Sequence, residues 1–589
     1  NAKTQQPVPG ATVAVTNTKL GAVSKQDGSF KVSNVPVGRY GIRVSCIGYE
    51  PIIRNIVLTA GKEEVLTIEL VEMYLETEAV TVTGSKGAFT PVNEAALVSS
   101  TVFSVDDVER FAGSRGDPAR MAQNFAGVLG VNDQRNDIII RGGSPSELLW
   151  RLDGLDIPNP NHFATQGATG GPVSALNSNL LDNSDFLTGA FPAEYGDRMS
   201  GVFDLRTRRG NEDRYEFLGQ FGFNGFEVMG EGPLPGVNGS FIANYRKSFL
   251  DLMEVIGIDL GWAGVPRYQD ATVKADVVLS ERDRLSVTGL AGISDIDIKT
   301  SKLDTVYTGD EDIRNGTDIV SLGVAWQHLF SDKTFGRLHV GTVYARYRTE
   351  VDSITTNNDN TVLDLTPWFH GYSTEGYHMA RYTLSYAATA RHYFTGGVES
   401  RLRYYDLDEQ RYTADLYTKD GSLYRVKSDG SSVQMLSFLN WNWRITEDLT
   451  SNIGVHTQYL DISKKTSFEP RFSMAWAFLP GQSLNVGVGI HRQSQPLLLY
   501  FTAPGNEDVD FTESVHYVVG YSFHPLDDWL VKVEGYYKDI SNAPVERDSA
   551  SGFSFLNSGA KFGSSVSGLP RLQSTGKGRT YGAGLTVMK

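Results

Sequence analysis

The chain has 589 residues, which exceeds a single ordinary core and predicts roughly two to four domains. Its net charge of −15 argues against a nucleic-acid partner, because phosphates require a basic face. The one cysteine, Cys46, excludes an internal disulfide and a cysteine-based metal site, and we expect it to be buried. No apolar run reaches the roughly 18 residues of a membrane-spanning helix, so a membrane protein with this sequence would have to be a closed barrel.

Residues 1–72 contain four short alternating segments separated by turn signals, at 11–15, 29–32, 40–44 and 66–70. This spacing predicts a small β-sandwich. The turn sequences Asp27-Gly28, Pro36-Val37-Gly38 and Ile47-Gly48-Tyr49 resemble those of the carboxypeptidase regulatory-like domain. The resemblance implies a transthyretin-like fold without catalytic residues.

Residues 73–95 have the composition of a linker with one extended, β-branched stretch. The stretch consists of Ala79, Val80, Thr81, Val82, Thr83 and Gly84. Such a segment can add as a strand to the sheet edge of a partner, and the alternative is a plain tether.

Residues 96–208 mix short helices and strands and predict a compact α+β domain. Ser104 can cap a helix that runs through Glu109, and Asp117-Pro118 can open a second helix that ends near Gly127. Strands are predicted at 137–141 and 148–152.

Residues 209–589 repeat alternating segments, and the pattern predicts about fifteen antiparallel strands. Tight turns such as 280–283 and 479–482 alternate with long polar loops at 297–317, 351–375 and 406–431. Short turns at one end and long loops at the other are typical of an outer-membrane barrel. The alternative is a soluble repeat such as a propeller, but no fixed period recurs in the sequence.

Four motifs in order over 126–205 resemble the plug of the TonB-dependent outer-membrane receptors. They are Ala126-Gly127-Val128, Ile140-Arg141-Gly142-Gly143, Leu152-Asp153-Gly154-Leu155-Asp156-Ile157-Pro158 and Phe191-Pro192-Ala193-Glu194-Tyr195-Gly196 with the strand that follows. Ala126 stands where that family usually has proline. The resemblance covers nearly the whole chain, and the regulatory-like domain in front makes it of the Bacteroidota type.

The resemblance implies a mainly-β fold, in which a transmembrane antiparallel barrel is filled by an α+β plug. It makes the stretch 79–84 a TonB box, and residues 141–143, 153–154 and 194–196 plug motifs. Arg141 would pair with a carboxylate of the barrel or plug rather than face solvent. Substrate would contact the apical loop of the plug at Asn159, Asn161, His162 and Phe163, although a lone loop histidine can also be merely solvated.

We find no catalytic motif, and we predict that the protein is not an enzyme and uses no cofactor or metal. The implied function is TonB-dependent import of a scarce solute across the outer membrane. The alternatives are a barrel serving as a subunit or scaffold of an outer-membrane complex, a signalling receptor, and a SusC-like glycan importer. The implied partners are TonB with its inner-membrane motor proteins and outer-membrane lipids. A surface lipoprotein or another outer-membrane subunit is an open further partner. The front domain and the box would lie in the periplasm.

Barrels of this family have about 22 strands, more than the segments counted here. An open sheet would leave unpaired amides in lipid. We therefore expect the native chain to continue for roughly seven strands beyond Lys589, and a leader to precede Asn1.

Overall fold

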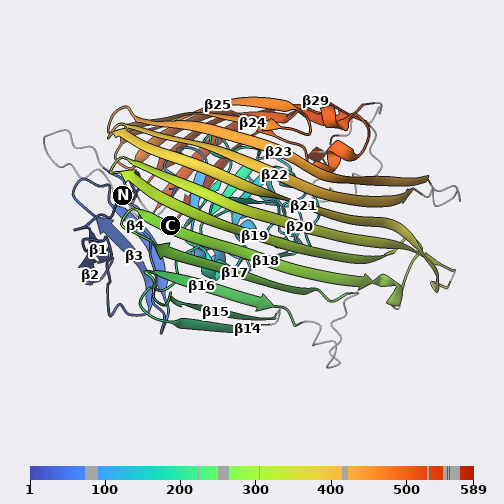
Figure 1. The fold of residues 1–589 in the computed structure, drawn as a ribbon, viewed down its shortest axis with the longest axis horizontal. Helices are drawn as coiled ribbons and strands as arrows, with labels where there is room; N and C mark the ends of the chain where they lie inside the picture. Colours follow the sequence, from blue (N-terminus) through green and yellow to red (C-terminus); the bar gives the residue numbers. More distant parts are fainter. Residues whose placement is uncertain are drawn as a thin grey trace.

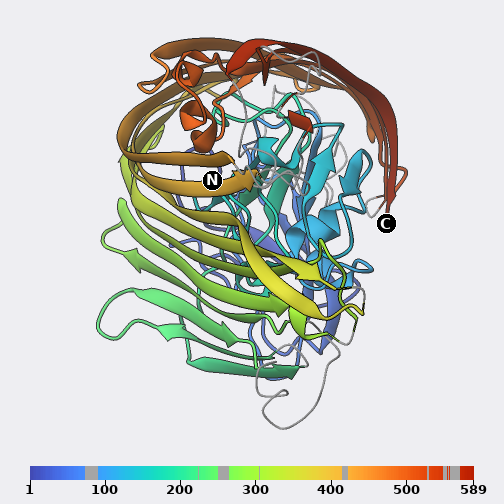
Figure 2. The same cartoon turned by 90° about the vertical axis from the view of Figure 1, so that its right-hand side faces the viewer.

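The computed structural model describes residues 1–72, 91–222, 225–249, 264–303, 305–357, 359–413, 422–526, 529–547, 554, 556–557 and 571–589. The described chain forms a front domain, a plug and a large curved sheet. Figure 1 shows the front domain at one end of the slanting strands of this sheet. Figure 2 shows the plug elements within the curve of the sheet. No helix in these ranges has the length and apolar character needed to span a bilayer.

The front domain is built on a four-stranded sheet with the order β2-β1-β3-β4. Its strands are β1 (Thr12–Val15), β2 (Gly21–Val23), β3 (Gly38–Ser45) and β4 (Ile52–Leu58). Val13, Val15 and Val44 are buried on one face because side chains alternate along a strand.

Two expected strands of the front domain, at 29–32 and 66–70, are not formed. The apolar residues of these segments still pack against the core: Phe30, Val32, Leu66 and Ile68. The alternation therefore predicted correctly which side chains face the core, but not that the segments pair as strands. Cys46 is half-buried at the edge of this core, so the expectation of full burial was wrong.

The plug has a five-stranded sheet with the order β5-β12-β13-β8-β9, flanked by short helices. Its elements are β5 (Ser100–Phe103), α1 (Val105–Arg110), α2 (Pro118–Ala122), β6 (Val128–Gly130), β7 (Ile138–Ile140), η1 (Pro145–Glu147), β8 (Leu148–Leu152), β9 (Leu155–Ile157), β10 (Asn161–His162), β11 (Val173–Ser174), η2 (Ser178–Leu180), β12 (Ser184–Leu187) and β13 (Gly201–Leu205). Phe203 lies at the centre of the core, stacked on Trp150 with a centroid distance of 4.3 Å and on Phe186 at 4.4 Å.

Both predicted plug helices begin where expected. The Ser104 hydroxyl accepts from the Asp107 amide, and the Asp107 carboxylate accepts from the Ser104 amide, which makes a complete capping box. Asp117 caps α2, with Pro118 in its first turn. Helix α2 ends at Ala122, earlier than the predicted end near Gly127.

Sixteen antiparallel strands, counted over the described residues, form the large sheet, with neighbours in sequence paired throughout. They are β14 (Glu216–Gly222), β15 (Gly225–Pro233), β16 (Gly239–Lys247), β17 (Arg267–Val278), β18 (Asp283–Lys299), β19 (Glu311–Ser331), β20 (Thr334–Thr356), β21 (Val362–Thr389), β22 (His392–Thr413), β23 (Ser422–Arg444), β24 (Leu449–Leu460), β25 (Lys465–Leu479), β26 (Gln482–Gln493), β27 (Thr512–Phe523), β28 (Leu530–Glu546) and β29 (Leu572–Met588). Short 3₁₀ turns also occur: η3 (Thr300–Lys302), η4 (Leu497–Phe501) and η5 (Asn506–Asp508).

Along β19, Val320, Leu322 and Val324 are exposed on the outer face. Ile319 and Ser321 are buried on the inner face. This apolar-out alternation is the pattern of a wall that faces lipid outside and a plugged lumen inside.

The predicted long loops are largely strand. Strands β20 and β21 enter the predicted loop 351–375 from both ends, and β18, β19, β22 and β23 do the same at 297–317 and 406–431. Polar and charged residues are frequent in these extensions, so the alternation by which a half-buried strand is recognised is weak there, although Leu363, Leu365 and Tyr372 are exposed. Cross-strand ion pairs such as Arg314–Glu350, at 2.8 Å, take the place of apolar contacts.

Candidate functional site

The candidate site is the interface between the plug and the inner wall of the sheet. Arg141 follows β7 and has a φ of 49°, so its backbone is in the left-handed region. Its Nη2 lies 2.8 Å from Glu534 Oε2 on β28, and its Nη1 donates to Ser99 Oγ at 2.9 Å. The guanidinium also lies over the Tyr536 ring, 4.8 Å from the centroid. The predicted pairing of Arg141 with a carboxylate is confirmed.

A second contact is a buried cluster of five charges centred on Asp156 of β9. Arg151 Nε donates to Asp156 Oδ1 at 2.6 Å within the plug. From the barrel wall, Arg401 pairs with Asp156, and Arg381 Nη2 lies 3.8 Å from Oδ1. Glu399 pairs with both barrel arginines and completes the cluster.

The cluster stabilises the ionised form of Asp156. Burial by itself would raise the pKa of this carboxyl. The guanidinium groups of Arg151, Arg401 and Arg381 outweigh burial and hold the pKa well below its ordinary value. The plug is therefore held to the wall by full charges in a water-poor site, where loss of one partner is costly.

The plug-motif glycines permit close approach of the plug backbone to the wall. A Cβ on Gly142 would lie 2.8 Å from Thr580 of β29, and one on Gly154 would lie 2.6 Å from His339 of β20. A Cβ on Gly196 would overlap His456 of β24 at 2.0 Å. Gly143 is packed inside the plug, where a Cβ would lie 2.6 Å from Ser200.

Asp153 also joins the plug to the wall. Its Oδ1 accepts from the Thr207 amide at 2.9 Å. Its Oδ2 accepts from Thr288 Oγ1 on β18 at 2.8 Å and lies 3.5 Å from Lys274 Nζ on β17.

Glu194 and Tyr195 hold the start of the plug. Asn93 Nδ2 donates to Glu194 Oε1 at 2.6 Å and to the Tyr195 hydroxyl at 2.9 Å. The Tyr195 hydroxyl donates to Asp204 Oδ2 at 2.9 Å. The same segment is anchored by Asp185, which accepts from the Val92 amide at 2.8 Å and the Asn93 amide at 2.7 Å.

The four loop residues expected to contact substrate are all buried. Asn161 Nδ2 donates to Asn159 Oδ1 at 2.8 Å, inside a network of plug amides. His162 Nε2 lies 2.9 Å from Asp270 Oδ2 on β17, and the Phe163 amide donates to Ser294 Oγ on β18 at 3.0 Å. The alternative of a solvated His162 was therefore wrong, while substrate binding by these four residues stays a prediction.

The predicted TonB box, Ala79 to Gly84, lies outside the described residues. The described chain on either side of it, at Val71 and Pro91, lines a cavity of about 2290 Å³. Residues of the front domain, the plug and the inner wall of the sheet line this cavity.

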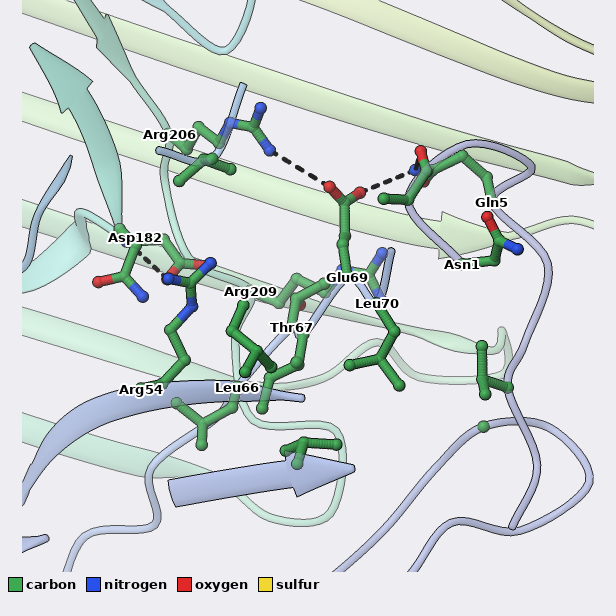
Figure 3. Close-up of a pocket in the computed structure, with 18 of the residues that line it drawn as sticks. Asn1, Gln5, Arg54, Leu66, Thr67, Glu69, Leu70, Asp182, Arg206 and Arg209 are labelled. Carbon is green, nitrogen blue, oxygen red and sulfur yellow. Dashed lines mark hydrogen bonds and ion pairs between the residues drawn. The ribbon is translucent and has the colours of Figure 1, made fainter. Parts of the chain in front are cut away.

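Charged side chains of the front domain, the plug and the segment before β14 meet in the cavity (Figure 3). Glu69 of the front domain accepts from Gln5 Nε2 at 2.8 Å, and its other oxygen lies 3.8 Å from Arg206 Nη1 of the plug. Arg54, Asp182 and Arg209 lie nearby in the same view.

Comparison with protein families gives three matches in chain order. Residues 1–82 match the CarboxypepD_reg-like domain, and residues 93–202 match the TonB-dependent Receptor Plug Domain. Residues 258–587, more than half of the chain, match the TonB dependent receptor-like, beta-barrel family. The chain belongs to the TonB-dependent receptors.

One curated relative of this receptor is the TonB-dependent transporter Oar of Myxococcus xanthus, 22% identical over 227 residues. The match covers 36% of the receptor chain and 20% of the relative, so the chain spans about a fifth of that relative's length.

Solved structures share the fold at low identity. The siderophore receptor PirA from Acinetobacter baumannii has a TM-score of 0.58 at 14% identity, covering 83% of this chain and 78% of its own. The outer membrane transporter YddB from Escherichia coli has a TM-score of 0.57 at 14% identity, covering 85% and 76%.

Membership assigns the receptor a plug and barrel architecture and an outer-membrane location. Receptors of this family interact with TonB and are transporters or receptors rather than known enzymes. The comparisons do not support the alternative of a complex subunit or scaffold.

The sequence alone did not single out the charge cluster around Asp156. Arg151 and Asp156 were visible as charged residues in apolar plug strands, which is a signal for a buried partner. Arg381, Glu399 and Arg401 had no such signal, because charges on the inner face of a barrel are common.

Proposed function

We propose that this receptor imports a scarce solute actively across the outer membrane, with energy supplied through TonB. The observation that carries the proposal is the way the plug is fastened inside the barrel, by buried ion pairs at Arg141 and Asp156. These ion pairs fix the plug at defined points, alongside apolar clusters that join Leu155 to Val343 and Val98 to Val518, and they must break before the plug can move.

The proposed divisions are a regulatory-like domain at 1–72, a linker with the TonB box at 73–95, a plug at 96–208 and a barrel at 209–589. The front domain and box lie in the periplasm in this proposal, and the ends of β19 to β23 remote from the front domain lie outside the cell. The family matches at 1–82, 93–202 and 258–587 support this division.

In the proposed cycle, solute binds at the outer side of the plug and TonB captures residues 79–84 as an added strand. Force on the box reaches the plug through Pro91 to Asn93, which Asp185 and Glu194 hold to the plug. Asp185 forms part of the plug sheet through β12, so a pull on this segment acts on the sheet directly. Asn159, Asn161, His162 and Phe163 are proposed to communicate solute binding to the wall.

The proposal is tested by Val82→Pro, which removes one main-chain donor from the added strand. We expect loss of TonB binding and of energy-dependent uptake, with normal barrel assembly. Val82→Ala is the matched control, since it shortens the side chain and keeps the donor. TonB binding by Val82→Pro at the level of Val82→Ala would contradict the proposal.

A further inference from the structure

The front domain is seated on the mouth of the barrel by polar contacts on one side of the rim. Lys31 Nζ lies 2.5 Å from Asp213 Oδ2, just before β14. Asn211 Nδ2 donates to Glu63 Oε2 at 3.3 Å, and the Glu63 amide donates to Glu216 Oε1 on β14 at 3.1 Å.

The same domain also reaches the opposite part of the rim and the plug. Arg444, at the end of β23, pairs with Glu50 at 2.9 Å and donates to the Glu72 carbonyl at 3.0 Å. Arg39 Nη2 lies 3.3 Å from Asp106 Oδ1 on the plug helix α1. Strands β14 and β23 lie far apart in the sheet order, so the domain bridges the mouth rather than hanging from one edge (Figure 1).

Most of these contacts are more exposed than those that hold the plug, although the Arg444 and Glu50 side chains are only 13% and 21% exposed. The side chains of Lys31 and Asp213 are 54% and 61% exposed, and that of Arg39 is 58% exposed. The Arg141 side chain at the plug interface is 4% exposed. Exposed ion pairs contribute little individually and are screened by salt, so opening the seat breaks mainly weak contacts, together with the largely buried Arg444–Glu50 pair.

We propose that the front domain is a reversible, salt-sensitive cap that closes the cavity at this mouth of the barrel. If the receptor imports a solute as proposed above, the cap must leave its seat before the solute can pass out of the cavity. In the closed position the domain also holds Glu72, where the linker begins, against Arg444 on the rim.

The closed state is tested by the reactivity of a thiol inside the cavity. In a Cys46→Ser background, Ser286→Cys places a thiol on β18 where the wall lines the cavity. The matched control is Ser331→Cys, at the exposed last residue of β19 and outside the cavity lining. A bulky maleimide should label Ser286→Cys at least tenfold more slowly in low salt than in high salt, while the control reacts equally in both.

Charge variants identify the seat itself. Lys31→Glu places a carboxylate beside Asp213 and Glu63, and it should expose the cavity thiol even in low salt. Adding Asp213→Lys should restore protection by exchanging the two charges. If Ser286→Cys is labelled at the same fast rate under all conditions, the front domain does not cap the cavity. If neither high salt nor Lys31→Glu speeds up the labelling, the cap does not open reversibly.

The need for opening is tested by locking the seat. Lys31→Cys and Asp213→Cys, joined by a short bis-maleimide in the Cys46→Ser background, should reduce uptake at least tenfold while TonB binding persists. Lys31→Cys alone, treated with the same reagent, is the control. Import by the joined protein at the control rate would overturn the need for opening. If the unjoined control also fails to import, the proposed import function is contradicted. The labelling of Ser286→Cys would still show whether the front domain covers the cavity.

Discussion

Arg141 of the plug and Glu534 of strand β28 form a buried ion pair across the plug–barrel interface, with 2.8 Å between Nη2 and Oε2. Glu534 Oε1 also accepts from the Ser99 amide at 3.1 Å and lies 3.1 Å from Lys532 Nζ. One carboxylate therefore joins two segments of the plug to the wall.

Replacing Arg141 with methionine should destabilise the docked plug by about 3 kcal/mol, because a buried carboxylate loses a charged partner. We place the value at the low end of the usual range because Lys532 remains. The measurement is plug release under denaturant, in a double-mutant cycle with Glu534→Gln. Fully additive costs in that cycle would show that the two side chains are not coupled.

The Asp156 cluster gives a second test. Asp156→Asn should cost about 3–5 kcal/mol of plug docking, because Arg151 loses its partner and two barrel arginines keep only Glu399. The matched control is Asp297→Asn, in the half-exposed pairs with Lys299 and Arg314, and it should cost less than about 1 kcal/mol. Equal losses of docking free energy in the two variants would show that the buried cluster holds the plug no more strongly than an exposed ion pair.

The contact between Gly196 and His456 predicts a compensating pair. Gly196→Ala should destabilise the plug by about 1–3 kcal/mol, because the new methyl group overlaps the buried imidazole. His456→Ala should relieve most of this overlap in the double variant. Gly535→Ala, where a Cβ meets nothing within 4 Å, is the control and should change stability by less than about 0.5 kcal/mol. A double variant no more stable than Gly196→Ala would exclude the overlap as the cause.

Asp185 predicts a pH dependence at the start of the plug. Burial raises the pKa of this carboxyl to about 6, against the hydrogen bonds from Val92 and Asn93 that lower it. Because the folded pKa is above the ordinary value of 3.8, this group stabilises the folded plug fully below about 3.8 and loses that contribution as pH rises through about 6.

Hydrogen exchange measures this effect. After correction for intrinsic rates, the amides of β12 that exchange through unfolding of the plug should be better protected at pH 5 than at pH 7. Asp185→Asn should remove the difference. Protection that increases towards pH 7 in the unchanged protein would reverse the predicted sign.

Local features of the plug could be predicted from the sequence where the signal is local. The strand predicted at 148–152 matches β8, because an apolar run ends at Asp153-Gly154, and Ser104 caps α1 as expected. In contrast, segments 29–32 and 66–70 alternate and lie on the front-domain core without forming ladders. Periodicity reports which side of the chain is buried, and it does not report pairing.

The charge cluster could not be predicted because its members come together only through the closed topology. Asp156 and Arg401 are 245 residues apart in the chain, and no pattern in a single sequence links them. The strand count was close, with about fifteen predicted and sixteen in the described sheet. In this sheet β14 pairs with β15 and β29 with β28, and continuation of the chain beyond Lys589 stays a prediction.

The unequal lengths of the strands give the receptor a lopsided rim. Strand β21 has 28 residues, roughly 90 Å of chain, while β14 has 7, roughly 23 Å. A tilted membrane strand needs only about 9–11 residues, so β19 to β23 rise well past the bilayer and stand as a stiff screen on one flank (Figure 1). Along the described strands, the wall is higher on that flank than at β14 to β16. In the proposed import function, this shape would set the direction from which a solute approaches the plug.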